Sequence, residues 1–180
     1  MSQPELSFEL RNYLSSSENS LIDEGIHLMY EAKNHFGSFR DFSFVVFPFA
    51  KAYEGFLKRI FFDLGFISNL DYKSKHFRIG KVMSPNLQRR LRNKSVYKKI
   101  CDKVNCEIAD AVWNTWKVGR NEIFHYYTSG VRMISIDQAE DTIELIIATM
   151  EQTYRELRMD KVQQRLSTLI NDKSYHNRLN

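Results

Sequence analysis

The chain has 180 residues, 43% of them hydrophobic and 27% charged, and a net charge of +4 with a pI of about 9.0. These values are typical of a soluble globular protein with one sizeable core. Only 7 glycines and 3 prolines are present, which excludes a loop-rich β sandwich and favours an all-α fold class.

The N-terminal stretch, MSQPELSFEL, is acidic and has no apolar run, so we expect no signal peptide. The most apolar run, FSFVVFPFA at 42–50, is too short to span a bilayer, so no membrane partner is expected. Cys101 and Cys106 stand five residues apart, without a CxxC pair or a nearby histidine cluster. This usage predicts reduced cysteines in a cytoplasmic protein with no zinc or other metal and no cofactor.

The first two long helices are predicted from apolar spacing and end signals. One spans about 20–36, with Ser20 as its N-cap and Gly37 as its stop. Its apolar stripe comprises Ile22, Ile26, Met29 and Tyr30. The next begins near Pro48, because proline suits the first turn of a helix, and ends at Gly65. Its stripe comprises Ala52 or Tyr53, Phe56, Leu57, Ile60, Phe61 and Leu64.

Three further elements follow in chain order. A loop leads to a short helix after Ser84, and a long helix covers about 106–127. The stripe of that long helix comprises Ile108, Val112, Trp116 and Ile123. After a brief extended stretch at 130–136, the last helix begins near Asp137, with Glu140 at capping-box spacing. Its stripe comprises Ala139, Ile143, Ile147, Met150, Tyr154 and Leu157.

Helices with one apolar stripe and short links pack as a bundle. The expected architecture is a bundle of four to five helices in a single domain over 1–180. Its core would cover about 20–158, followed by a polar C-terminal extension over 159–180 that frays at its end. Trp113 and Trp116 are expected in this core rather than on a base-stacking surface.

The segment from Lys73 to Lys99 carries ten lysines and arginines and no carboxylate, with Phe77 and Tyr97 interleaved. Such a run is typical of a surface that contacts the phosphate backbone of nucleic acid. The residues expected to bind RNA are Arg89, Arg90, Arg92 and Lys94. The alternative is a solvated loop and helix whose charges keep the protein soluble.

The stretch 118-VGRNEIFHYYTSG-130 places Arg120 five residues before His125. On an α-helix these two side chains would point about 140° apart, whereas Asn121 and His125 would share a face. Two arrangements would still bring arginine and histidine together. The helix ends or kinks near His125, or a two-fold dimer joins the arginine of one copy to the histidine of the other. Gly119 favours the dimer, because a glycine inside a helix often allows close approach of another backbone.

Histidine exchanges protons near neutral pH, and arginine binds phosphate oxygens with a charged fork. RNA carries a 2′-OH beside each scissile phosphate, so a histidine base and an arginine could cleave it without metal. No carboxylate cluster indicates a metal-dependent nuclease. The structural alternative is a surface arginine and a hydrogen-bonded histidine at a helix end, and spacing alone does not decide between them.

Arg-Asn-x-x-x-His on the penultimate helix of a bundle resembles the Rx4–6H motif of the HEPN superfamily, whose catalytic members are metal-independent endoribonucleases. The stretch 48-PFAKAYEGFLKRIFFDLGFI-67 looks like the corresponding helix of RNase LS-type toxins. In these toxins a basic residue and a glutamate join the arginine and histidine, and the matching positions are Lys51 and Glu54. Without the resemblance, an intrahelical ion pair with Lys51 or Lys58 would explain Glu54.

Tyr127 extends the match to Rx4HxY, a variant found in HEPN toxins whose antitoxin is a nucleotidyltransferase that can attach AMP to the tyrosine. The alternative is a core or interface aromatic. The resemblance covers about 20–158 and implies a homodimer in which both motifs face one composite cleft.

The resemblance implies a HEPN-type endoribonuclease that acts as a toxin in a toxin–antitoxin or phage-defence system. Arg120 and His125 would be catalytic, Asn121, Glu54 and Lys51 would support them, and the partners would be RNA and an antitoxin protein. The alternative is a non-catalytic HEPN module that binds RNA or a protein. A helical DNA-binding regulator is a third hypothesis.

Overall fold

The structure, a computed structural model, describes residues 6–35, 37, 39–125 and 133–176, with side chains as far as Arg158. Over these residues it is helical and contains no strand. The chain begins with the short helix α1 (Phe8–Tyr13), and its four long helices are α2 (Ser16–Asn34), α3 (Ser43–Asp63), α8 (Cys106–Trp116) and α9 (Ile136–His176). The all-α prediction is therefore confirmed for the described part of the chain.

Between α3 and α8 lies a group of short helices. These are α4 (Asn69–Lys73), α5 (Ile79–Met83), the 3-10 turn η2 (Pro85–Leu87), α6 (Gln88–Leu91), the 3-10 turn η3 (Arg92–Lys94) and α7 (Val96–Lys103). A π-helical turn, η4 (Lys117–Glu122), directly continues α8. Most of the basic segment is thus helical, where a loop and one short helix were expected. Helices of four or five residues are too short to show a repeating apolar stripe.

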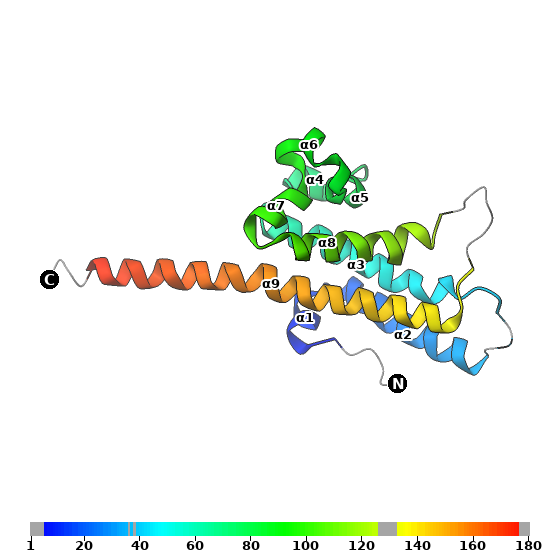
Figure 1. Ribbon diagram of the computed structural model, residues 1–180. Coiled ribbons are helices and arrows are strands. Elements are labelled where there is room, and N and C mark those ends of the chain that lie inside the picture. Colours follow the sequence, from blue (N-terminus) through cyan, green and yellow to red (C-terminus); the bar gives the residue numbers. More distant parts are fainter. Residues whose placement is uncertain (1–5, 36, 38, 126–132, 177–180) are drawn as a thin grey trace.

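The four long helices form the bundle, and the short helices gather on one side of it (Figure 1). α2 packs along α3, α3 and α8 pack against α9, and α5 and α7 rest on α8. The C-terminal half of α9 extends beyond the other helices. No helix in the described ranges is long and apolar enough to cross a membrane.

α3 supplies the centre of the core. Its fully buried aromatic side chains are Phe49, Tyr53, Phe56 and Phe61. The buried Tyr53 hydroxyl donates to the carbonyl oxygen of Val112 at 3.2 Å, which satisfies its polar end and ties α3 to α8. The core also extends N-terminal to the expected start at residue 20, because α1 and its flanks bury Leu6, Leu10 and Leu14.

The predicted N-cap of α2, Ser20, is wrong. Ser15 caps this helix, because its hydroxyl accepts from the backbone amide of Glu18 while the Glu18 carboxylate accepts from the Ser15 amide. This capping box starts the helix earlier than expected. Tyr30, expected on the apolar stripe of this helix, is instead 59% exposed. The predicted cap of α9 is wrong for the same reason. Ser135 and Gln138 form the capping box of this helix, in place of Asp137 and Glu140.

α3 begins at Ser43 rather than near Pro48, which lies buried inside the helix. Burial of Val45 and Val46 ahead of the proline offsets the backbone hydrogen bond that proline cannot donate. The predicted stop at Gly65 is confirmed. This residue has φ 70, and the Phe66 amide donates to the Phe61 carbonyl at 2.8 Å in a Schellman motif.

Cys101 and Cys106 form a disulfide, whereas reduced cysteines were expected. Cys101 lies in the last turns of α7 and Cys106 begins α8, so the reversal between the helices brings their Cα atoms within 4.2 Å. Sequence spacing does not reveal such a reversal, because the five-residue separation fits one continuous helix equally well.

Candidate functional site

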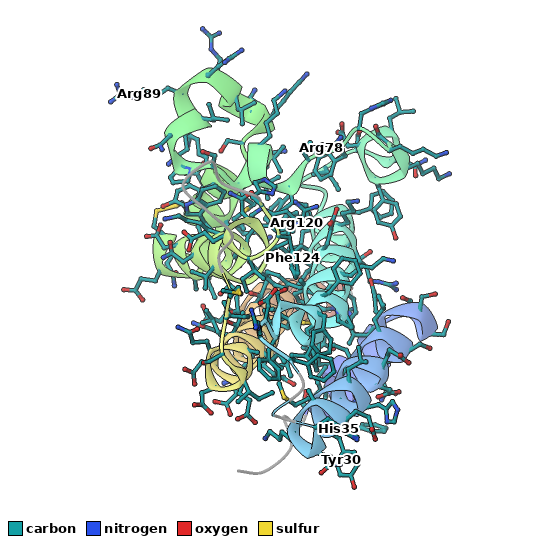
Figure 2. The ribbon with its side chains drawn as sticks, turned by 90° about the vertical axis from the view of Figure 1, so that its right-hand side faces the viewer. Tyr30, His35, Arg78, Arg89, Arg120 and Phe124 are labelled. Atoms are coloured by element: carbon teal, nitrogen blue, oxygen red, sulfur yellow. A yellow bond between two sulfur atoms is a disulfide. The ribbon has the colours of Figure 1, made fainter. Side chains whose placement is uncertain are left out.

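A cavity of about 310 Å³ opens between α3 and the end of η4. Its walls comprise Phe47, Ala50, Lys51, Glu54, Arg120, Phe124 and His125. Four of these were predicted as site residues from two stretches of chain more than 60 residues apart. Figure 2 shows Arg120 and Phe124 close together in the middle of the molecule.

α3 presents its part of the site along one stripe. Phe47, Ala50, Lys51 and Glu54 are spaced by three and four residues, so they share a face, while Tyr53 and Phe56 point into the core. The Lys51 ammonium lies 6.0 Å from the centroid of the Phe47 ring. Glu54 pairs with Lys58 at 3.1 Å, so one of the two intrahelical ion pairs considered for it is present.

Arg120 is held from two sides. Its Nη2 atom lies 3.8 Å from the Glu54 Oε2 atom, and its guanidinium carbon lies 5.1 Å from the centroid of the Trp116 ring. The Glu54 carboxylate thus stands between two cations, Lys58 and Arg120. With 40% of its side chain exposed, the guanidinium retains N–H groups that can reach a ligand in the cavity.

The end of the helix explains how Arg120 and His125 reach one cavity. Arg120 lies on the π-helical turn, which stops at Glu122, and its carbonyl accepts from the Phe124 amide at 3.3 Å. The helix then ends, and His125 lies exposed beyond the last turn with no regular structure. The first of the two expected arrangements, a helix that ends or kinks near His125, is therefore confirmed.

Gly119 was expected to allow the close approach of a second copy of the chain, but its close neighbour belongs to the same chain. A Cβ atom at this position would lie 3.0 Å from the side chain of Ile146. The glycine therefore lets the π turn pack closely on α9 of the same chain.

Phe47 and Phe124 form the apolar wall of the cavity, with their rings edge to face at 5.6 Å between centroids. Sequence reasoning missed both. Phe47 could have been found because it lies on the stripe of Lys51 and Glu54, and Phe124 because it precedes His125. Phe47 is 52% exposed, which is unusual for a phenylalanine in the most apolar run of the chain.

The remaining predicted site residues lie elsewhere. Asn121 is half-buried and does not line the cavity, because the π turn rotates it away from the face that it would share with His125 on an α-helix. Tyr127 falls outside the described residues. Trp116 is buried and Trp113 half-buried, as expected for core residues.

The four expected RNA-binding cations, Arg89, Arg90, Arg92 and Lys94, are exposed on α6 and η3. Figure 2 shows Arg89 pointing outward from the end of the short helices, apart from Arg120. This basic surface is thus separate from the cavity.

Among the residues with described side chains, no group of three or more histidines, cysteines and carboxylates gathers as metal ligands would. Comparison of the chain with protein families, characterised proteins and solved structures finds no match.

Proposed function

We propose that this protein is a metal-independent endoribonuclease of the HEPN type. The observation that carries the proposal is the convergence of Lys51, Glu54, Arg120 and His125 on one cavity. These residue types in one cavity supply a proton carrier, a phosphate-binding fork and a second cation.

In the proposed reaction His125 takes the proton of the RNA 2′-OH, and the 2′ oxygen attacks the adjacent phosphorus. The bond to the 5′ oxygen breaks, that oxygen takes a proton from water as it leaves, and His125 returns its own proton to the solvent. Arg120, supported by Trp116 and Glu54, stabilises the negative charge that develops on the phosphate oxygens. The products are a 2′,3′-cyclic phosphate and a 5′-hydroxyl end.

The test compares cleavage of a fluorogenic RNA by the wild type with cleavage by His125→Ala and Arg120→Ala, in excess EDTA. Loss of general-base catalysis or of phosphate stabilisation typically costs about 100-fold or more, so we expect each variant to lose at least that factor. His35→Ala is the matched control, because His35 is an exposed histidine far from Arg120 (Figure 2). Wild-type cleavage that EDTA abolishes, or equal rates in all variants, would overturn the proposal.

A non-catalytic module that binds RNA is the second candidate. The observation that favours it is the exposed basic surface of α6 and η3, which lies apart from the cavity. In this case His125→Ala binds RNA as tightly as the wild type and no cyclic-phosphate product forms. Neutralising Arg89 and Arg90 then removes the binding.

The resemblance to HEPN toxins also underlies the proposal of a homodimer restrained by an antitoxin. Phe47, exposed at the cavity wall, supports an apolar contact there with a second copy. Light scattering of the wild type and of Phe47→Asp tests the dimer, which the aspartate should dissociate. Growth on induced expression, with and without His125→Ala, tests toxicity.

A further inference from the structure

A second cavity, of about 520 Å³, lies among the short helices. Its walls come from the turn after α3, from α4 and α5, from the 91–94 turn and from α7. It shares no lining residue with the first cavity. Its volume falls within the range of small-molecule sites.

Positive charge dominates this cavity. Arg78, Lys81, Lys94 and Lys99 line it, and Asp71 is the single carboxylate in its wall. The Asp71 carboxylate already accepts from the hydroxyl of Ser68, at 2.7 Å, and from its amide, at 3.2 Å. Within the described residues none of the four cations lies within 4.0 Å of a carboxylate, whereas Lys58, Arg59 and Lys98 elsewhere do. Hydrogen bonds from Ser68, with a smaller effect of Lys94 and Lys99, lower the pKa of Asp71.

Two of these cations are held by uncharged groups. The Lys99 ammonium donates to the carbonyl oxygen of Phe66 at 2.5 Å. The Arg78 guanidinium donates from one nitrogen to the carbonyl oxygens of Lys75, at 3.1 Å, and Phe77, at 3.4 Å. Carbonyl oxygens fix the position of a cation without cancelling its charge, so both retain donors for an anion.

The 91–94 turn adds a strained backbone at the cavity wall. Arg92 has φ 50 and ψ −119, a combination that glycine normally supplies in tight turns. The turn sends Leu91, Asn93 and Lys94 into the cavity, whereas Arg92 itself is exposed and does not line it. A strained turn of this kind persists because the surrounding structure fixes it.

We infer that this cavity binds the phosphate of a phosphomonoester. A terminal phosphate carries close to two negative charges at neutral pH and three acceptor oxygens, which match unpaired lysine and arginine donors. The volume leaves room for an attached nucleoside, and the half-buried Phe77 offers it an apolar surface. The phosphate has two possible sources, the 5′ end of an RNA strand and a free mononucleotide.

α5, which carries the cavity residue Lys81, packs on α8 beside the indole that supports Arg120. A Cβ atom on Gly80 of α5 would stand 2.9 Å from the Trp116 indole nitrogen.

The experiment titrates the full-length protein with inorganic phosphate and with AMP by calorimetry. The double variant Arg78→Gln, Lys94→Gln removes two cavity cations, and the control Arg40→Gln, Arg155→Gln removes the same charge from exposed positions outside both cavities. We expect the cavity variant to weaken both ligands at least about tenfold, the loss typical of one charge-assisted hydrogen bond, and the control to change binding less than twofold. Equal weakening in both variants, or no saturable binding by the wild type, would overturn the inference.

Amide chemical shifts of the wild type give a second readout that does not depend on the variants' folding. AMP should shift the resonances of Lys94 and Lys99 and leave those of Arg89 and Arg90 in place. The reverse pattern contradicts the inference.

A third titration separates the sources, using His125→Ala protein and RNA oligonucleotides with a 5′ phosphate or a 5′ hydroxyl. If the phosphorylated RNA binds more tightly than the hydroxyl RNA and AMP competes with it, the ligand is an RNA end. If the protein binds AMP but binds the two RNAs with equal affinity, the ligand is a mononucleotide. Because all readouts measure binding, failure of the proposed cleavage reaction would leave them unaffected.

Discussion

Arg92 is, within the described residues, the one non-glycine residue with positive φ. A non-glycine residue in this region of backbone conformation lowers the stability of the fold by about 1–3 kcal/mol. The conformation holds because Ser95 caps α7 directly after the turn, donating from its amide to the Arg92 carbonyl at 3.1 Å. The strained backbone of Arg92 is thus hydrogen-bonded to the N-cap residue of α7, which packs on α8.

Arg92→Gly should therefore raise the free energy of unfolding by about 1 kcal/mol, because the strain relieved exceeds the extra chain entropy that glycine loses on folding. Urea denaturation followed by circular dichroism measures this change. Asn93→Gly is the control, since Asn93 has no positive φ and its replacement should destabilise the protein. A lower stability of Arg92→Gly would show that the arginine side chain contributes more than its backbone costs.

Some residues of the candidate site could be predicted from the sequence and others could not. Lys51 and Glu54 share a helix face by spacing alone, and a motif pointed to Arg120 and His125. Asn121 was misplaced because that argument assumed an α-helix, and no sequence pattern predicts the π turn. Phe47 was missed because a phenylalanine in an apolar run is indistinguishable from a core residue until its exposure is known.

At the scale of elements, the α2–α3 contact depends on one glycine. A Cβ atom at Gly25 would lie 2.3 Å from the ring of Phe49, which is fully buried. The two helices can pack this closely only because the position has no side chain, and a buried ring has little room to move.

Gly25→Ala should lower the free energy of unfolding by about 2 kcal/mol, because overpacking outweighs the gain in helix propensity. Thermal and urea denaturation measure the change. Gly37→Ala serves as control, since no atom lies within 4 Å of its added Cβ, and it should leave stability within about 0.5 kcal/mol. Equal stabilities of the two variants would refute the close packing.

Tyr97 joins α7 to α8, since its hydroxyl donates to the Asp110 Oδ1 atom at 2.6 Å. This hydrogen bond, together with burial and the nearby negative charge, raises the pKa of Tyr97 to about 12. A tyrosine in the unfolded chain loses its proton near pH 10. The stabilisation from this group is therefore fully present below pH 10 and is lost as the pH rises through about 12.

Tyr97→Phe should make the fall in stability between pH 10 and 12 less steep, because one proton no longer distinguishes the folded from the unfolded chain. Part of the fall should remain, since burial also raises the pKa of Tyr53. Urea midpoints at a series of pH values measure the slope. Asp110→Asn should reduce it similarly, and a slope equal to the wild type in both variants would contradict the assignment.

Helix ends were predicted well only where a single residue type decides them. Gly65 was found because positive φ strongly favours glycine. The start of α2 was not, because serines stand at 15, 16, 17 and 20 and each is a competent cap. Glu18 selects Ser15 by completing the capping box, a signal that the sequence does contain.

At the scale of the whole molecule, the candidate site and the basic surface lie in two different groups of helices. The bundle holds the candidate site, and the short helices carry the basic surface and the second cavity. The sequence predicted the charge of this second body, because a count is independent of folding. It did not predict the cavity, which needs residues from five segments brought together.

The triple variant Arg89→Gln, Arg90→Gln, Arg92→Gln should reduce the salt dependence of RNA binding. Each phosphate contact on a single strand contributes about 0.7 to the logarithmic slope, so three contacts correspond to a decrease of about 2. Fluorescence anisotropy with His125→Ala protein between low and moderate salt measures the slope. Lys98→Gln is the control, because its ammonium pairs with Asp102 at 2.6 Å, and an unchanged slope in the triple variant would exclude this surface from RNA binding.

The π-helical turn also bears on how such sites are sought in other sequences. Arg120 lies on the π turn and His125 lies beyond the end of the helix, so the two residues line one cavity at a spacing that would separate them on a regular α-helix. A search that requires an arginine and a histidine on one face of a continuous helix would therefore miss a pair such as this one.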